Sequence, residues 1–109
     1  MTATVRSEGE YTIVSLTGEV DMHTSPVARK LILGCLRDGR PTLVDLAAVA
    51  YIDSSGVASL VEGFQLARQR QLDFGLVGVG AAALNVLKLA RLDQVFPIYA
   101  SVQERIGKI

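Results

Sequence analysis

Residues 41–70, PTLVDLAAVAYIDSSGVASLVEGFQLARQR, decide the fold. Two apolar pieces, residues 41–46 and 49–52, predict buried strand, because unbroken apolar character suits a strand covered on both faces or placed near the centre of a sheet. A polar turn, residues 53–56, follows at once. Apolar residues then return at spacings of three and four, which predicts an amphipathic helix to about Arg70. They are Val57, Leu60, Val61, Phe64 and Ala67.

The segments on either side continue the alternation of strand and helix. Residues 4–6 and 11–17 predict a hairpin. Thr24 and Pro26 begin a helix that ends at Gly39. Strands over residues 73–79 and 95–98 then alternate with helices over residues 81–90 and from Ser101 to residue 105 or 106. This order predicts an α/β fold: a mixed, mostly parallel sheet of four or five strands, an N-terminal antiparallel hairpin and about four helices.

Composition restricts the class of protein. A chain of 109 residues, half of them apolar, predicts a single domain over residues 1–109 and excludes intrinsic disorder. Eleven basic and eleven acidic residues cancel, so there is no basic footprint for nucleic acid or for an anionic membrane. Cys35 is the only cysteine. We expect it to be a small core residue, and a single cysteine excludes a zinc cluster. We expect no metal and no cofactor.

Targeting signals are also missing from the sequence. The longest apolar run, residues 46–52, is far shorter than the ~20 residues of a membrane helix. The first residues, MTATVR, lack the charged head and apolar body of a secretory signal. We therefore expect a cytoplasmic protein.

Two acidic turns, residues 18–21 and 53–56, follow predicted strands, and partners of such sheets usually meet the carboxyl ends of the strands. Ser54 and Ser55 are both candidates to cap the following helix, and local chemistry alone favours this structural interpretation. The functional interpretation uses the same geometry, because a helix N-terminus can also hold a phosphate. A phosphoserine adds roughly 1.5–2 negative charges. Beside Asp53 and Asp21, that charge would repel an acidic or apolar partner.

Five segments occur together in one order: GEVD (18–21), VDL (44–46), YIDSSGV (51–57), LVGV (76–79) and LDQVF (92–96). With this order, residues 5–106 resemble the STAS domain family, and most of all its single-domain anti-sigma factor antagonists. One departure is Ala58, where the family often has a second glycine. This change alters how closely a partner helix can approach.

The resemblance implies a switch without catalysis by this chain. It implies that Ser54 is phosphorylated by a partner that is both anti-sigma factor and serine kinase. The unphosphorylated form would bind that partner and release the sigma factor, and a phosphatase would reset the switch. Asp21, Asp53, Ser55 and Gly56 would surround the phosphorylated serine. The expected partner-binding residues are Glu19, Asp21, His23, Ser54, Ser55 and Val57.

Other functions stay open on the sequence. Similar domains serve as accessory subunits of lipid-transport ABC transporters, where the partner is an ATPase or permease and no switch is needed. A hydrolase using Ser54 and His23 is the weakest alternative, because no G-x-S-x-G elbow surrounds the serine. Gly78, Gly80 and Ala83 match a dinucleotide fingerprint, but too few residues follow for such a fold, so they predict a tight turn.

Overall fold

The computed structural model describes residues 1–107, which form strands and helices in the expected order. The strands are β1 (Thr2–Glu8), β2 (Tyr11–Val20), β3 (Thr42–Ile52), β4 (Phe74–Val77) and β5 (Ile98–Tyr99). The helices are α1 (Ser25–Arg37), α2 (Ser54–Gln69), α3 (Ala81–Leu89) and α4 (Val102–Ile106). Among these residues no helix combines the length and the apolar character that crossing a membrane requires.

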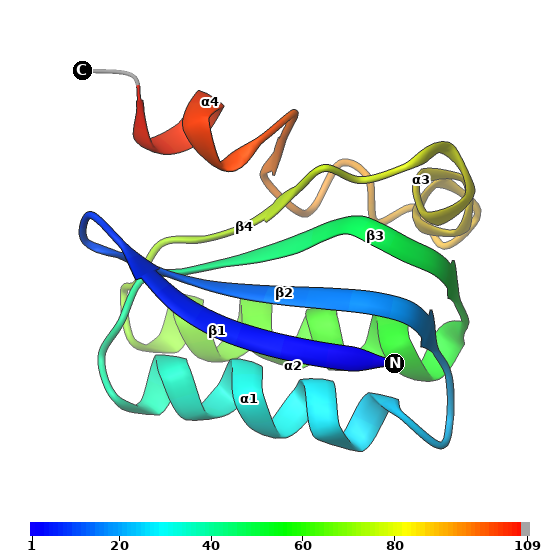
Figure 1. Cartoon of the computed structure of the whole chain (residues 1–109), viewed down its shortest axis with the longest axis horizontal. Coiled ribbons are helices and arrows are strands. Elements are labelled where there is room, and N and C mark those ends of the chain that lie inside the picture. The colour runs from blue at the N-terminus through cyan, green and yellow to red at the C-terminus, as the bar shows by residue number, and fades with distance from the viewer. Residues whose placement is uncertain (108–109) are drawn as a thin grey trace.

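The sheet follows the order of the chain, β1-β2-β3-β4-β5. β1 is antiparallel to β2, and every other neighbouring pair is parallel. The predicted fold class is therefore confirmed, with β3 at the centre. Figure 1 shows α1 and α2 side by side on one face, α4 on the opposite face, and α3 beside the carboxyl-terminal part of β3.

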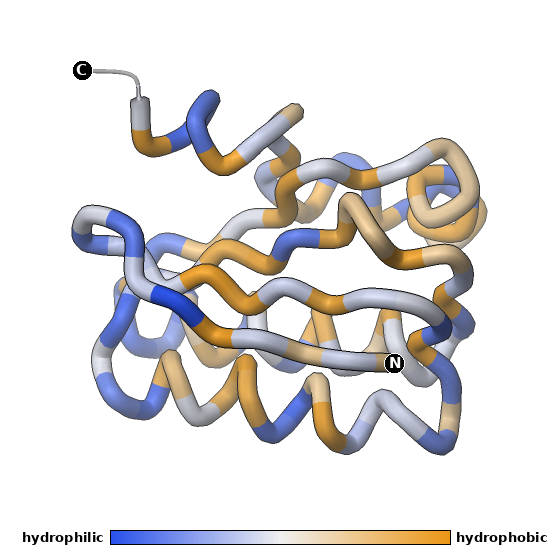
Figure 2. Tube along the Cα trace, in the orientation of Figure 1, coloured by the Kyte–Doolittle hydropathy of each residue, from blue (hydrophilic) through white to orange (hydrophobic). Residues whose placement is uncertain are grey.

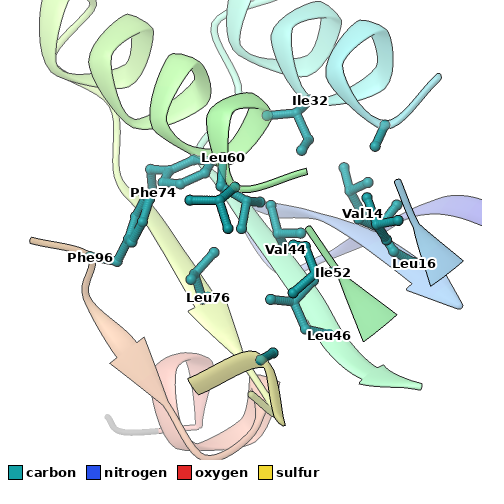
Figure 3. Close-up of a cluster of buried hydrophobic side chains, with 14 of the residues drawn as sticks. Val14, Leu16, Ile32, Val44, Leu46, Ile52, Leu60, Phe74, Leu76 and Phe96 are labelled. Carbon is teal, nitrogen blue, oxygen red and sulfur yellow. The ribbon is translucent and has the colours of Figure 1, made fainter. Parts of the chain in front are cut away.

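The core is divided by the two faces of the sheet. Val14 and Val44 face α1 and α2, in a cluster that also contains Ile32 and Leu60 (Figure 3). Their chain neighbours Ile13 and Leu43 point to the other face and pack beneath α4. This alternation follows from the two-residue repeat of a strand. Figure 2 shows the apolar residues along the middle of the sheet and hydrophilic residues at the β1–β2 turn.

The hairpin strands are longer than predicted. β1 covers Thr2–Glu8 rather than residues 4–6, because all seven of its residues pair with β2. β2 continues through residues 18–20, which the sequence indicated as a break. The polar residues there keep pairing with β3 through two shifts in register, and Gly18 adopts a φ of +76°. A bulge allows a strand to continue through such a segment.

Three other strand boundaries differ from the prediction. The two apolar pieces, residues 41–46 and 49–52, form the single strand β3. β4 is shorter than residues 73–79. The strand predicted over residues 95–98 is present but begins later, as β5, because Val95 and Phe96 lie in a turn in which both N–H groups donate to the Leu92 carbonyl. Phe96 is buried because its ring packs against Phe64, with centroids 5.6 Å apart.

The predicted turns and the cysteine are confirmed. Gly39 ends α1 with a left-handed φ of +79°. Gly78 also has a positive φ, +66°, and a Cβ there would lie 2.9 Å from the Cβ of Ala47. Gly80 then caps α3, so the glycines make the tight turn that was expected. Cys35 is buried on the inner face of α1.

Candidate functional site

The two acidic turns meet at one end of the sheet. Val20 and Ile52, the last residues of β2 and β3, are register partners. The Asp53 N–H then donates to the Val20 carbonyl at 3.1 Å. Parallel pairing of the two strands therefore places the loop after β2 directly beside the start of α2.

Asp53 holds the first turn of α2 together. Its Oδ1 accepts from the Ser55 N–H at 2.9 Å, the Gly56 N–H at 3.3 Å and the Ser55 hydroxyl at 2.5 Å. The Ser55 hydroxyl is the largest cause that lowers the pKa of Asp53, and the Met22 N–H adds to it. Asp53 is thus an anionic N-cap. The expectation that a serine hydroxyl caps this helix is wrong, because the carboxylate occupies that position.

The two serines of the turn have different environments. Ser55 is half-buried, and its hydroxyl is already donated to Asp53. Ser54 is exposed as the first residue of α2, and among residues 1–107 its hydroxyl has no hydrogen-bond partner. Of the two hydroxyls, that of Ser54 is the one open to an incoming reagent.

Three N–H groups in the first turn of α2 are already in use. Those of Ser55 and Gly56 donate to the Asp53 carboxylate, and that of Val57 donates to the Asp53 carbonyl at 3.0 Å. The Asp53 carboxylate thus occupies the position at the helix N-terminus where these N–H groups converge.

The loop after β2 is held by Asp21 and Thr24. Asp21 Oδ1 accepts from the His23 N–H at 2.9 Å and the Thr24 N–H at 3.1 Å. These bonds, with that of His23 the largest, lower the pKa of Asp21. The Thr24 hydroxyl accepts from the Asp21 N–H and donates to the Glu19 carbonyl, both at 2.9 Å. The loop thus presents a second fixed carboxylate beside Asp53.

Gly56 is required by close packing. A Cβ at this position would lie 2.7 Å from Ile52 Cγ1 and 2.9 Å from Val20 Cγ1. It would also lie 3.0 Å from the Val20 carbonyl oxygen. The glycine therefore lets α2 start directly against the ends of β2 and β3.

Most of the expected partner-binding residues lie at this end, and one does not present its side chain there. Glu19, His23 and Ser54 are exposed, and Asp21 and Ser55 are half-buried. The prediction that Val57 binds the partner is wrong. Val57 is only 6% exposed and belongs to the core, because α2 begins at Ser54 and turns Val57 inward.

Two exposed apolar residues at this end were not predicted from the sequence to belong to the site. Met22 lies in the loop after β2 and is 70% exposed, and Tyr51 near the end of β3 is 51% exposed. The only signal for Met22 was its position between the polar residues Asp21 and His23. Together with the carboxylates they give this end a mixed acidic and apolar surface.

The described part of the chain lacks the arrangements that a serine hydrolase or a metal site would need. Across residues 1–107, no hydrogen bond joins the His23 side chain to Ser54 or to either aspartate; only the His23 backbone N–H binds Asp21. The same residues hold no group of three metal-ligating side chains. The geometry therefore presents a free Ser54 hydroxyl next to the Asp53 cap, at the end of the sheet where Asp21 follows β2.

A five-stranded mixed sheet with paired helices on one face and an aspartate-capped Ser-Ser-Gly turn defines a small α/β domain. The family model for the STAS domain matches residues 2–105. The chain belongs to the STAS domain family.

Named proteins are similar to the chain in sequence and in fold. The chain is similar to the anti-sigma-B factor antagonist of Listeria monocytogenes, with 29% identity over 86 residues, 78% of this chain and 75% of the relative. It also resembles the crystal structure of an anti-sigma factor antagonist from Mycobacterium paratuberculosis, with a TM-score of 0.85 and 29% identity over 97% of this chain and 91% of that one.

The fold is shared as well with SpoIIAA in both of its forms. The unphosphorylated form has a TM-score of 0.83 at 18% identity and covers 98% of this chain and 95% of its own. The phosphorylated form, described as a Bacillus cell fate determinant, has a TM-score of 0.77 and covers 98% of both chains. At this identity the likeness concerns the fold alone.

Proposed function

We propose that this chain is an anti-sigma factor antagonist whose binding is switched off by phosphorylation of Ser54. In this role the unphosphorylated chain binds an anti-sigma factor that is also a serine kinase, and the sigma factor is released. The proposal is supported by the named antagonists to which the chain is similar. It places the chain in the bacterial cytoplasm.

The observation that carries the choice of residue is the difference between two adjacent hydroxyls. Ser54 is exposed with no partner among the described residues, whereas Ser55 donates to Asp53 at 2.5 Å. In the transfer, Ser54 Oγ attacks the γ-phosphorus of ATP and gives up its proton. The bond between that phosphorus and the bridging oxygen breaks, and ADP leaves. This chain is the substrate and performs no catalysis itself; a phosphatase would hydrolyse the new bond.

The charge of the site explains why a phosphate would weaken binding. Asp21 and Asp53 are held as anions by hydrogen bonds that lower both pKa values. A phosphate adds roughly 1.5–2 further negative charges. The N–H groups of Ser55 and Gly56 already donate to Asp53. The added charge therefore faces the partner, where it repels acidic groups and imposes a desolvation penalty on an apolar contact.

Matched serine variants test the choice of residue. The chain is incubated with ATP and each anti-sigma kinase encoded in its genome, and intact mass is measured for the wild type, Ser54→Ala and Ser55→Ala. We expect one phosphate on the wild type and on Ser55→Ala, mapped to Ser54, and none on Ser54→Ala. Phosphate on Ser54→Ala, or modification mapped to Ser55, contradicts the proposal.

A pull-down from the native organism separates this role from the transporter role. The antagonist role predicts recovery of a kinase of the anti-sigma type, more strongly with Ser54→Ala than with Ser54→Asp. Recovery of an ABC transporter ATPase or permease, equally with both variants, would replace the proposal with the accessory-subunit function.

A further inference from the structure

A groove runs along the free edge of the sheet, far from Ser54. It has a volume of about 550 Å³ and lies between β1 and α1. Its apolar lining includes Val5 and Val27, which are 43% and 52% exposed. Cys35 also lines the groove, and its charged lining residues are Lys30, Asp38 and Arg40. No residue of the acidic turns lines the groove, so a role for this surface is independent of the proposed function.

The strand that borders this groove has an unused edge. β1 is the first strand in the sheet order, and within residues 1–107 it pairs only with β2. Its outer N–H and C=O groups can therefore accept another strand. A small apolar ligand would leave those backbone groups unpaired, whereas a strand would satisfy them and cover Val5 at the same time.

The helix that borders the groove has a self-complementary charge pattern. Lys30, Gly34 and Asp38 all line the groove. They follow one another at intervals of four, so Lys30 and Gly34 lie on one face of α1 and Asp38, its C-cap residue, continues that face. Two such helices placed antiparallel about Gly34 bring each lysine opposite the aspartate of the other copy. Gly34 has open space around it, with no atom within 4 Å of a Cβ built there.

The strand edge accepts the same symmetry. A twofold axis at Val5 places Thr4 opposite Arg6 and Ala3 opposite Ser7 of the second copy, so no like charges meet. Val5 and Gly34 line the same groove, and one axis can pass beside both. The formal net charge of zero adds no overall repulsion between copies.

We propose that this groove is a self-association surface, in which β1 of two copies pair antiparallel about Val5 and the two α1 helices exchange Lys30–Asp38 ion pairs about Gly34. The result is a twofold dimer with one continuous ten-stranded sheet, twice the five strands of one copy. Both Ser54 sites remain outside the interface.

Charge exchange tests the pairing directly. Sedimentation equilibrium of the full chain is expected to show a monomer–dimer equilibrium. Lys30→Asp alone and Asp38→Lys alone each place like charges opposite one another, and we expect each to weaken dimerisation about tenfold or more. Mixed together, the two variants restore opposite charges at both positions, so they should form a heterodimer about as tight as the wild-type dimer.

A second variant tests the close approach at Gly34. Gly34→Arg fits the open space of the single chain but fills the groove of the dimer, so the variant should fold and remain monomeric. Ser54→Ala serves as the control and should leave dimerisation unchanged. A wild-type chain that stays monomeric at all concentrations overturns the proposal. A dimer that is unaffected by Gly34→Arg and by the single charge variants also overturns it. The same holds if the chain stays monomeric and β1 pairs only with a foreign peptide.

Discussion

At the scale of single residues, the site depends on which hydroxyl Asp53 engages. The motif Asp53-Ser54-Ser55-Gly56 could be recognised in the sequence, and so could its position between strand and helix. The sequence could not tell the two serines apart, because both are near enough to cap the helix. That Asp53 accepts three donors and leaves Ser54 free depends on where α2 begins, one turn earlier than the apolar spacing indicated.

The cap makes a prediction about stability. Asp53→Ala removes the acceptor of two N–H groups and one hydroxyl, and it should lower the urea midpoint of unfolding. Ser54→Ala, which loses no hydrogen bond, should leave the midpoint nearly unchanged. Because the pKa of Asp53 is lowered on folding, its contribution is present above the unfolded pKa of 3.8 and is lost as the pH falls through the lower folded value. The difference between wild type and Asp53→Ala should therefore shrink below about pH 4. A constant difference from pH 7 to pH 2 contradicts this explanation.

Gly56 makes a second prediction. Gly56→Ala gains about 1 kcal/mol in helix propensity but forces contacts under 3 Å with Ile52 and Val20. Overpacking of this kind costs about 1–3 kcal/mol or more, so we expect a net loss of about 1–2 kcal/mol in the free energy of unfolding. Gly34→Ala is the control, since it has open space and should be stabilising by about 0.5–1 kcal/mol. Both are measured by urea titration at low protein concentration. An equal effect of the two variants would show that crowding at Gly56 is unimportant.

At the scale of elements, the order of strands and helices could be predicted, and the pieces with weak local signals could not. Val95 and Phe96 are strand-forming residues, but the aromatic contacts of Phe96 hold them in a turn, and the strand begins only at Ile98. The break expected from residue 18 onward is an irregularity inside β2, a register shift between Gly18 and Glu19 that is visible only once β3 pairs beside it. Short-range patterns indicate element type, while pairing decides where an element ends.

An ionic cluster of Tyr11, Asp73 and Arg105 fixes the short helix α4 to the sheet. This cluster could not be predicted from the sequence. Asp73 accepts hydrogen bonds from the Tyr11 hydroxyl and the Arg105 guanidinium. Arg105 also lies over the Tyr11 ring, 5.1 Å from its centroid. Burial, followed by the bond to Asp73, raises the pKa of Tyr11 to about 12.

From this ionic cluster we expect a loss of stability in alkali. An unfolded tyrosine loses its proton near its ordinary pKa of 10.0, whereas Tyr11 in the folded chain holds it to about 12. The stability that this shift contributes is complete below pH 10 and is lost as the pH rises towards 12. Ultraviolet titration should show one late tyrosine that is missing in Tyr11→Phe and titrates earlier in Asp73→Asn. If Asp73→Asn leaves that titration unmoved, the charge of the Asp73 carboxylate plays no part in the shift.

At the scale of the whole molecule, a balanced total charge hides an uneven distribution. The sum of zero could be read from the sequence, but the gathering of Glu19, Asp21 and Asp53 at one end requires the parallel pairing of β2 and β3. Exposed Met22 and Tyr51 lie at the same end. The surface around Ser54 therefore offers a partner an apolar contact beside carboxylates. A new negative charge on Ser54 would disturb that contact.

A change at Ser54 should alter this surface without altering the fold. Ser54 is exposed and unpaired among the described residues, so we expect Ser54→Asp to keep the circular dichroism spectrum and to shift the free energy of unfolding by less than about 0.5 kcal/mol. Ser55→Asp is the contrasting variant, because it loses the bond to Asp53 and sets two carboxylates together; it should be the less stable of the two. Equal stability of the two variants would mean that the serines are equivalent.

The decisive measurement is titration calorimetry of the anti-sigma partner against two forms of this chain, one unmodified and one carrying phosphate on Ser54 alone. We expect the phosphate to weaken binding about 30–150-fold, which corresponds to about 2–3 kcal/mol. Equal affinity of the two forms, with phosphate on Ser54 verified by mass, would rule out the phosphoswitch.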